Sequence, residues 1–427
     1  MPGWLLRVVR FSRAIWVRAG LFTLAGVVLA LLAPVVGRYA PASATLDLGQ
    51  DAVATILQII ATAMLTVTTF SVTAMVSSLT GAAGTTTPRA VTLLAEDRTT
   101  QTALATFLGA FAFAIVGIVA LATQYYDETA RIVLFVGTLV VIVVVVVTLL
   151  RWIAHLVRFG RHSDVLDRVE ERACAVVTQY RRQPRSGGAA EVPVPAGAVA
   201  VTAGSAGFVT HVDVGRLQRW AGDGGHRVHV RSLPGALIGS ASVIAHVVTD
   251  EPGDGSEDVA RAVRAAFAVE RHRTYEQDPR LGVVALGEVA SRALSPATND
   301  PGSAIDALAS LHRVLESYLG EATDAEMRAA AVEHDRVHVP VVTLDQLLDD
   351  AFVPIGRDGA ALVEVMVWLQ HVIEMLLRLA QGPDAQALRD LSLDAEERAV
   401  AATTSERDVA KVRRAARAAR AARAEPS

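Results

Sequence analysis

A row of hydroxyl and amide side chains repeats at helical spacing inside one apolar segment, residues 51–80. Successive members lie three or four residues apart, so on a helical wheel they all fall within an arc of about 100°. Asp51 falls on the same arc at one end of the segment. Side chains of this kind can line a wetted path through a membrane, with the carboxylate favouring cations at the mouth. Besides Asp51, the members of this polar row are Thr55, Gln58, Thr62, Thr66, Thr69, Thr73, Ser77 and Thr80.

The polar row also has a packing interpretation, and the sequence leaves the two open. Threonine and serine suit contacts with neighbouring helices, where small side chains pack closely and hydroxyls bond across or back to the carbonyl four residues earlier. A carboxylate in the first turn of a helix, such as Asp51, is also favoured by the helix dipole alone. Because no charged residue lies in the middle of the segment, a proton-relay transporter is disfavoured.

The polar row needs a helix that crosses a bilayer, and residues 1–155 are expected to form a transmembrane domain of four helices. A hydrocarbon core of roughly 30 Å needs about 20 apolar residues, and a lone strand in lipid would leave its backbone unpaired. In the third segment Ala110, Ala114 and Gly117 lie at helical spacing and allow another helix to approach closely. The four apolar segments cover about residues 19–37, 51–80, 104–123 and 132–150.

Arginine placement predicts the orientation of these spans. Basic residues predominate before the first span, between the second and third, and after the fourth, whereas acidic residues predominate in the other two loops. Because basic loops stay on the cytoplasmic side, we expect both termini, and everything after about residue 156, to be cytoplasmic. The first span is too long for a cleaved signal peptide, and the unpaired Cys174 fits a reducing compartment. The arginines concerned are Arg7, Arg10, Arg13, Arg18, Arg89, Arg98, Arg151, Arg158 and Arg161.

The composition of the 427 residues agrees with a membrane protein. Hydrophobic residues make up 52% and charged residues 20%, against about 45–50% and about 25% in ordinary soluble domains. The formal net charge of −4 gives no basic signature of a nucleic-acid-binding protein, so we expect no nucleic acid partner. A single cysteine excludes a disulfide scaffold.

The rest of the chain predicts a cytoplasmic mixed α/β domain. Residues 156–190 continue as a charged helix and end in a linker rich in proline and glycine. Short β-type runs between glycine and proline turns in residues 191–250 predict a small β-barrel or sandwich. Helical periodicity returns in residues 256–383, and residues 384–427 form a charged helical tail. The arginines of this tail suit either a solvated helix or a contact with anionic lipid headgroups.

Residues 274–311 read TYEQDPRLGVVALGEVASRALSPATNDPGSAIDALASL. This run resembles the signature of the bacterial membrane protein family known as domain of unknown function 2254. FSVTAMVSSL with the TTTPRAV that follows, GFVTHVDVGRL through RSLPGALI, and LLDDAFVPIGRDGA at 347–360 are also similar. Thr298 and Gly302 stand where larger residues are common in the family. The resemblance implies four spans, a cytoplasmic domain and a bacterial inner-membrane location, with no agreed biochemical activity.

Prolines and capping residues define a turn at the centre of this signature. Pro296 ends one helix, because the residue before it, Ser295, is kept out of the helical region, and Asp300 followed by Pro301 is a strong helix start. One interpretation is a rigid helix–turn–helix hairpin. The other is a ligand or subunit contact, although two of its residues also suit an ordinary exposed pair four positions apart. The residues of that contact are Glu288, Arg292, Asn299 and Asp300.

Signals for catalysis are weak, and we expect neither a cofactor nor a metal. His226 and His229 lie three apart on a predicted strand, so they point to opposite faces and form no local chelate. His334 and His338 have helical chelate spacing but lie in a segment typical of a strand. The segment RSLPGALIGSASVIAHV resembles the turn of a lipoyl-carrier module, yet no lysine lies near it to hold the cofactor. Cys174 has no local partner that would mark it as a nucleophile.

These features favour an oligomeric channel-like conduit for ions or small solutes. Four spans are too few to enclose a wide pore, so the path would form in a homo-oligomer, with the cytoplasmic domain gating or assembling it. The alternative is a non-conducting membrane-anchored scaffold or sensor, in which the polar row only packs. An enzyme is the least supported class.

Overall fold

The computed structural model describes residues 15–37, 50–95, 97–157, 159–249, 257–320 and 331–422. Arg7, Arg10, Arg13 and Arg158, which carry part of the orientation argument, lie outside these ranges. The chain divides into two compact units. The helical unit takes most of the chain up to Asp164, and the mixed unit takes Thr85–Ala90 together with Val165–Ser427.

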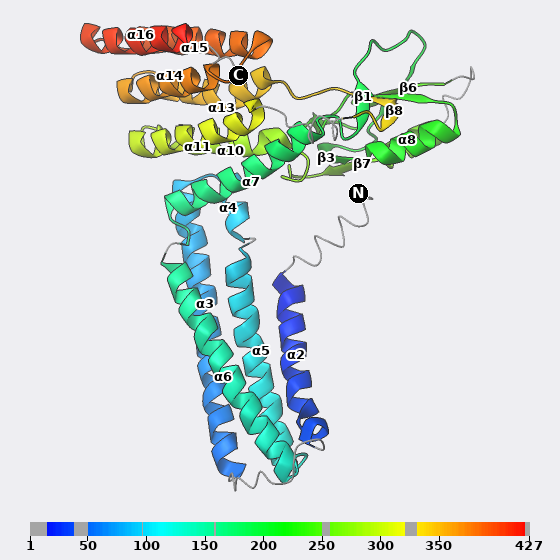
Figure 1. Cartoon of the computed structure of the whole chain (residues 1–427), viewed down its shortest axis with the longest axis vertical. Helices are drawn as coiled ribbons and strands as arrows, with labels where there is room; N and C mark the ends of the chain where they lie inside the picture. Colours follow the sequence, from blue (N-terminus) through cyan, green and yellow to red (C-terminus); the bar gives the residue numbers. More distant parts are fainter. Residues whose placement is uncertain are drawn as a thin grey trace. The chain divides into compact units, whose positions relative to one another are not determined.

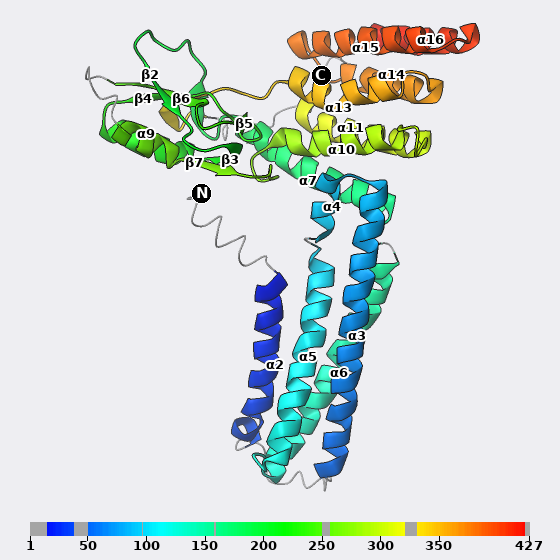
Figure 2. The same ribbon diagram turned by 180° about the vertical axis from the view of Figure 1, so that it is seen from behind.

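Within the described residues, four helices of the helical unit are long and apolar enough to cross a membrane. They run alongside one another in the two views of Figures 1 and 2. Asp97 and Asp127 cap the third and fourth by accepting hydrogen bonds from the backbone N–H groups of Thr100 and Ala130. The four predicted spans are thus confirmed as membrane-length helices. Their bounds are α2 (Ile15–Gly37), α3 (Gln50–Thr85), α5 (Arg98–Ala122) and α6 (Glu128–Leu156).

Small residues let the helices of this unit approach closely around α5. Ala110 and Ala114 are buried, and a Cβ on Gly117 would lie 3.0 Å from the Leu57 side chain of α3. A close approach also brings α2 against α5, where a Cβ on Gly26 would overlap the carbonyl oxygen of Gly109. The contact face predicted from Ala110, Ala114 and Gly117 is therefore confirmed, and Gly109 is a member that the pattern did not single out.

Two open sheets form one half of the mixed unit. The five-stranded sheet has the order β1-β8-β4-β6-β2, and the three-stranded sheet has the order β5-β3-β7. Helices α8 (Val214–Asp223) and α9 (Glu257–Arg264) contribute apolar side chains to the same core as the strands. The strands are β1 (Gly188–Ala190), β2 (Val199–Thr202), β3 (Gly207–Val212), β4 (Arg227–Val230), β5 (Leu237–Ile238), β6 (Val243–Val248), β7 (Phe267–Glu270) and β8 (His334–Val339).

These sheets differ from the barrel or sandwich expected in residues 191–250. Within the described residues neither sheet closes on itself, so the barrel is not confirmed. Three strands lie outside that range: β1 lies in the expected linker, β7 lies in the expected helical stretch, and β8 covers the segment of His334 and His338 that the sequence marked as typical of a strand. β8 pairs in parallel with both β1 and β4, which are far from it in the chain. Such pairing leaves no local pattern, and β1 and β7 have only 3 and 4 residues, too few for a periodicity to be read.

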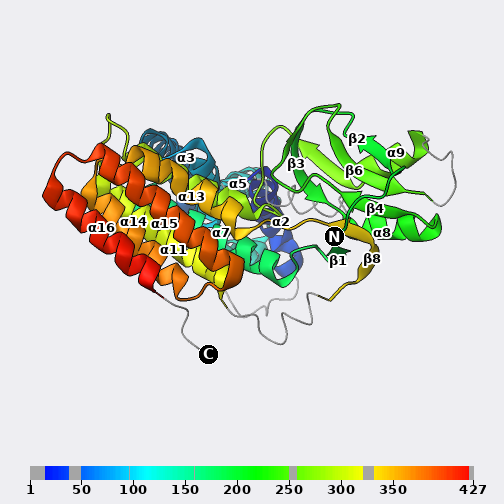
Figure 3. The same cartoon turned by 90° about the horizontal axis from the view of Figure 1, so that it is seen from above.

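A stack of helices forms the other half of the mixed unit, and Figure 3 shows α11, α14, α15 and α16 layered beside one another. α10 contacts α11 and α13, whereas α14 contacts α11, α15 and α16. The first residues of α4 (Pro88–Ala95) also belong to this unit. The remaining helices are α7 (His162–Arg182), α10 (Pro279–Ala293), α11 (Pro301–Leu319), α13 (Leu344–Asp358), α14 (Val363–Leu377), α15 (Gly382–Ala402) and α16 (Glu406–Ala421).

The charged tail expected at residues 384–427 packs as part of this stack as far as it is described. Arg420 of α16 donates hydrogen bonds to Ser392 and Glu396 of α15, at 3.2 and 2.6 Å. The Ser392 hydroxyl in turn donates to the buried Gln370 side chain of α14 at 2.7 Å. α16 has a narrow buried face made of small residues at helical spacing, which is hard to recognise in the sequence because arginines are so frequent there. That face consists of Val412, Ala415, Ala416 and Ala419.

Replacing Gly26 by alanine should destabilise the helical unit, because the added methyl group overlaps the Gly109 backbone, which cannot turn aside as a side chain would. Overpacking of this kind costs about 1–3 kcal/mol. We therefore expect the detergent-solubilised protein to show a lower thermal unfolding midpoint. Gly20→Ala on the same helix is the matched control, since nothing lies within 4 Å of its Cβ position. Equal midpoints for the two variants would contradict the close crossing of α2 and α5.

Candidate functional site

The polar row of α3 lies on the face of that helix turned away from the other helices of its unit. Asp51, Gln58 and the other members of the row are exposed from one end to the other. The buried residues of α3 lie on the opposite side of the helical wheel. Among them, Leu57 and Met64 belong to the core that α3 shares with α5 and α6. Packing within its own unit therefore does not account for the polar row.

Most hydroxyls of the polar row bond to their own helix. Thr62, Thr66 and Thr73 each donate to the carbonyl four residues earlier at 3.0 Å. Thr55, Thr69 and Thr80 do the same at 2.7, 2.9 and 2.8 Å. Each of these hydroxyls uses its only proton within the helix and keeps lone pairs available outward. The polar row thus presents acceptor oxygens and methyl groups, to which Gln58 adds an amide.

The exposed faces of the neighbouring helices are apolar by contrast. α2 exposes Leu24 and Leu32, and α6 exposes Val143 and Leu150, all side chains that suit lipid tails. An amide without a partner in an apolar medium costs roughly 2–7 kcal/mol. Gln58 is therefore the member of the polar row least suited to face lipid. The exposed face of α3, unlike the exposed faces of α2 and α6, is better suited to water or to another protein surface than to lipid tails.

The turn of the signature forms the expected helix–turn–helix hairpin between α10 and α11. Asp300 caps α11 by accepting a hydrogen bond from the Ser303 N–H at 3.1 Å, and Pro301 is the first residue of that helix. Asn299 has a φ of 47°, in the left-handed region that asparagine tolerates, and its N–H donates to the Ser295 carbonyl at 2.8 Å. The hairpin interpretation therefore matches the geometry.

An open pocket of about 920 Å³ lies beside the hairpin, and every residue that lines it belongs to the mixed unit. Of the residues predicted for the helix–turn motif or the contact, Glu288, Arg292, Ser295 and Pro296 line it, whereas Asn299, Asp300 and Pro301 do not. Sequence reasoning missed the remaining lining residues. These are Thr87, Pro88, Arg89, His272, Ser291, Leu294 and Asp358.

Residues from three distant parts of the chain meet in this pocket. Thr87 to Arg89 come from the TTTPRAV segment, Glu288 to Pro296 from residues 274–311, and Asp358 from residues 347–360. Each of these segments carries the family resemblance described above. That shared resemblance is the signal that could have grouped them, although it does not say which of their side chains converge.

Both carboxylates of the pocket are engaged by arginines. The Arg89 guanidinium pairs with Glu288. Arg357 donates two hydrogen bonds to Asp358, at 2.7 and 2.9 Å, and these hold the pKa of Asp358 below its ordinary value. The Ser291 hydroxyl donates to the same carboxylate. The pocket therefore combines paired charges with hydroxyl groups.

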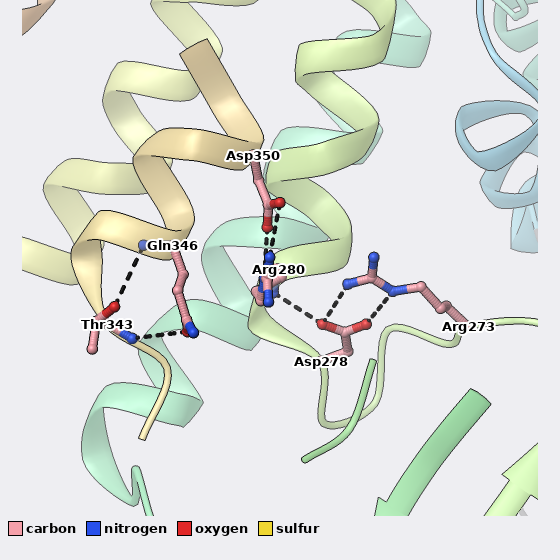
Figure 4. Close-up of polar contacts among 6 residues, drawn as sticks. All are labelled: Arg273, Asp278, Arg280, Thr343, Gln346 and Asp350. Carbon is pink, nitrogen blue, oxygen red and sulfur yellow. Dashed lines mark hydrogen bonds and ion pairs between the residues drawn. The ribbon is translucent and has the colours of Figure 1, made fainter. Parts of the chain in front are cut away.

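Two bidentate ion pairs fix α10, the helix that supplies Glu288, Ser291 and Arg292 to the pocket (Figure 4). Arg273 donates to both oxygens of Asp278, at 2.7 and 3.0 Å, and Asp278 caps α10 by accepting from the Arg280 N–H at 3.1 Å. The Arg280 side chain pairs with Asp350 of α13 at 2.6 and 2.9 Å. Burial raises the pKa of Asp278 above its ordinary value, although Arg273 opposes this. Planar pairs of this kind fix orientation as well as distance.

α13, which ends at Asp358, is held against α10 along its length. A Cβ on Gly287 of α10 would lie 2.9 Å from the Asp350 carbonyl oxygen, so the two helices require a glycine there. At the start of α13 the Thr343 hydroxyl accepts from the Gln346 N–H at 3.4 Å, and the Gln346 side chain accepts from the Thr343 N–H at 3.3 Å (Figure 4). The contact at Gly287 and the pair of Arg280 with Asp350 hold α13 against α10, and Asp358 at the end of α13 accepts a hydrogen bond from Ser291 of α10.

Three histidines lie side by side across neighbouring strands of the five-stranded sheet. His229 of β4 is in register with His246 of β6 and with His338 of β8. Directly opposed residues point to the same face of a sheet, and the rings of His229 and His338 stack with centroids 4.7 Å apart. Burial, with smaller contributions from the charges of His338 and His246, lowers the pKa of His229. The sequence placed His229 and His338 on strands but did not show that they meet.

Other reactive groups do not gather into a centre. In the described part of the chain, no group of three or more His, Cys, Asp or Glu side chains is arranged to hold a metal ion. Cys174 of α7 is half-buried, and burial raises the pKa of its thiol, so little of it is in the reactive thiolate form. The polar row and the pocket are the features with functional character.

Comparison with known proteins identifies relatives without a described activity. The model of a family described as "Predicted membrane protein (DUF2254)" matches residues 12–375. Uncharacterized proteins of Mycobacterium tuberculosis strain CDC 1551 and of Mycobacterium bovis are each 26% identical over 226 residues, which is 51% of this chain and 43% of either relative. The chain thus matches less than half the length of these relatives. No solved structure matches the chain.

Acidification should weaken the sheet that holds the three histidines. Because the pKa of His229 is lowered on folding, the unfolded chain binds this proton more readily, so stability is complete at neutral pH and falls as pH drops below about 6.5. We expect His229→Gln to show a smaller loss of thermal stability between pH 7 and pH 5. His371→Gln, at an exposed position of α14, is the control and should behave as the unsubstituted protein does. An unchanged loss in the His229 variant would refute this role.

Proposed function

We propose that this chain, which belongs to the membrane protein family DUF2254, assembles as a homo-oligomer in which α3 lines a conduit for ions or small solutes. The family match and the four apolar helices show a membrane protein. The conduit, the oligomer, a bacterial inner-membrane location and cytoplasmic termini are the proposal. It assigns no catalytic step to the chain.

The observation that carries the proposal is the exposure of the entire polar row. A helix whose opposite face is already packed must direct this row toward lipid, toward another protein surface or toward water. Lipid is the least favourable of the three for Gln58. Copies of α3 arranged around a symmetry axis would remove the polar row from lipid and turn it toward a shared path.

The chemistry of the polar row suits cations and neutral polar solutes. Its threonine oxygens keep lone pairs outward while their protons are bonded within the helix. Oxygen atoms that accept but do not donate can replace part of the hydration shell of a cation. Asp51 adds a negative charge at one end of the row.

The length of α3 supports a continuous path. Its apolar span of 34 residues, Asp51–Gly84, is about 50 Å long, whereas a hydrocarbon core is roughly 30 Å thick. The polar row extends along nearly this whole length, from Asp51 to Thr80. Some of its members would therefore lie at every depth of the bilayer.

A non-conducting scaffold or sensor is the second candidate. The observation that favours it is the bonding of six threonine hydroxyls to their own helix, because such a face can pack against another copy of α3 without water. The exposed arginines on α16 also suit a contact of this assembly with anionic headgroups.

Cysteine accessibility separates the two candidates. In a Cys174→Ser background, cysteines at Thr62, Thr66, Thr69 and Thr73 should react with a charged, membrane-impermeant thiol reagent at least tenfold faster than control positions, because thiols on a conduit wall meet water. Two classes of control are available on the same helix. Leu65 and Val72 are exposed but apolar and lie outside the arc of the polar row, and Leu57 and Met64 are buried.

The reaction rates at these positions distinguish a conduit from a scaffold. Fast reaction on the polar row alone supports a water-filled path. Slow reaction at all positions would exclude the conduit and leave the non-conducting scaffold or sensor as the supported function. Flux of a monovalent cation salt into liposomes containing the purified protein, blocked by the same reagent in the Thr66→Cys variant, gives the direct measurement of conduction.

A further inference from the structure

The pocket beside the hairpin has no role in the proposed conduit, yet it has the size and the groups of a ligand site. Its volume of about 920 Å³ lies within the roughly 300–1,000 Å³ range of small-molecule sites. Leu294, Pro296 and Pro88 give it apolar walls, and its polar groups come from α10, the end of α13 and the start of α4. Its walls are thus held by separate elements that the ion pairs of α10 keep in place.

The charge around the pocket favours an anion. Arg89 and Arg292 line it together with the carboxylates of Glu288 and Asp358, so the charges of the lining itself balance. Arg357 lies outside the lining and pairs with Asp358, which leaves two guanidinium groups around the Glu288 carboxylate. Guanidinium groups bind phosphate and carboxylate groups through paired hydrogen bonds, which suits them to such ligands.

Glu288 marks the place where the anionic group of a ligand would bind. Its carboxylate pairs with Arg89, and the two side chains are 36% and 43% exposed. A pair this exposed contributes little to stability, so a dissolved anion can compete for the guanidinium. Arg292 lies one helical turn after Glu288 on the same face of α10, within reach of the same position.

Thr87 provides an independent indication that the pocket binds a ligand. It lines the pocket, is 6% exposed, and its hydroxyl has no hydrogen-bond partner among the described residues. Buried hydroxyls are bonded in most proteins, and a rotation about the Cα–Cβ bond of Thr87 would bring this buried hydroxyl within reach of a ligand that supplies the missing partner. Thr87 lies two residues before Arg89, at the same edge of the pocket.

We infer that this pocket is a binding site for a small organic oxyanion, a molecule with a phosphate or carboxylate group held by Arg89 and Arg292 in the place of Glu288. The apolar walls and the remaining volume accommodate the rest of such a molecule. The inference does not depend on conduction, because binding alone is its readout.

Thermal unfolding of the full-length protein in a phosphate-free detergent buffer tests the inference. Inorganic phosphate and citrate are the probes, each compared with sodium chloride at equal ionic strength. Binding to the folded state raises the midpoint with increasing probe concentration, and the concentration that gives half of the effect reports affinity. A response to phosphate alone identifies a phosphate-bearing ligand, and a response to citrate alone identifies a carboxylate.

Two variants should change the probe concentration that gives half of the effect in opposite directions, which a merely structural role would not produce. Arg292→Gln should raise the concentration needed at least tenfold, whereas Glu288→Gln should lower it severalfold because the competing carboxylate is gone. Arg378→Gln is the matched control, since Arg378 pairs with Glu374 at the end of α14 and does not line the pocket. No response to either probe, or equal affinities in the Arg292 and Glu288 variants, would overturn the assignment.

Discussion

Inside a bilayer no water is available to satisfy polar groups, and this constraint governs what the two faces of α3 can do. The helix uses its apolar face, with Leu57 and Met64, to complete the core around α5. Among the described residues, no other helix of the unit covers its polar face. The threonines reduce the cost of exposing that face by bonding to their own backbone, but the Gln58 amide has no comparable solution in lipid. The two faces of α3 therefore require different neighbours.

In the mixed unit, the position of the pocket residues depends on how α10 is held. Its first turn is anchored by the buried Asp278, its outer face by the pair of Arg280 with Asp350, and its middle by the close approach at Gly287. Because these contacts fix the rotation of α10 about its axis, they also fix which of its side chains face the pocket. Arginine is used in each pair, and its planar guanidinium gives a defined geometry that lysine would not.

Features that depend on near neighbours in the chain could be predicted from the sequence. The four spans follow from long apolar segments, and the hairpin follows from Ser295, Pro296, Asp300 and Pro301, whose effects act within a few residues. The outward direction of the polar row could not be predicted, because periodicity gives a face but not its neighbour.

The sheets could not be predicted because they depend on the pairing of distant strands such as β8 with β1, which leaves no pattern in the nearby sequence. The buried face of α16 was concealed because alanine is weakly apolar and arginine is frequent. The pocket joins three segments that are distant in sequence, so only some of its residues were foreseen.

α3 has one further consequence for how the protein could work. It runs from Gln50 to Thr85 without a proline and without a break, so it behaves as a stiff rod under torsion. A rotation of the helix by one residue position turns its faces by about 100°. Because α3 is unbroken from Asp51 to Thr80, such a rotation would carry every member of the polar row with it, so all of them would change their surroundings together.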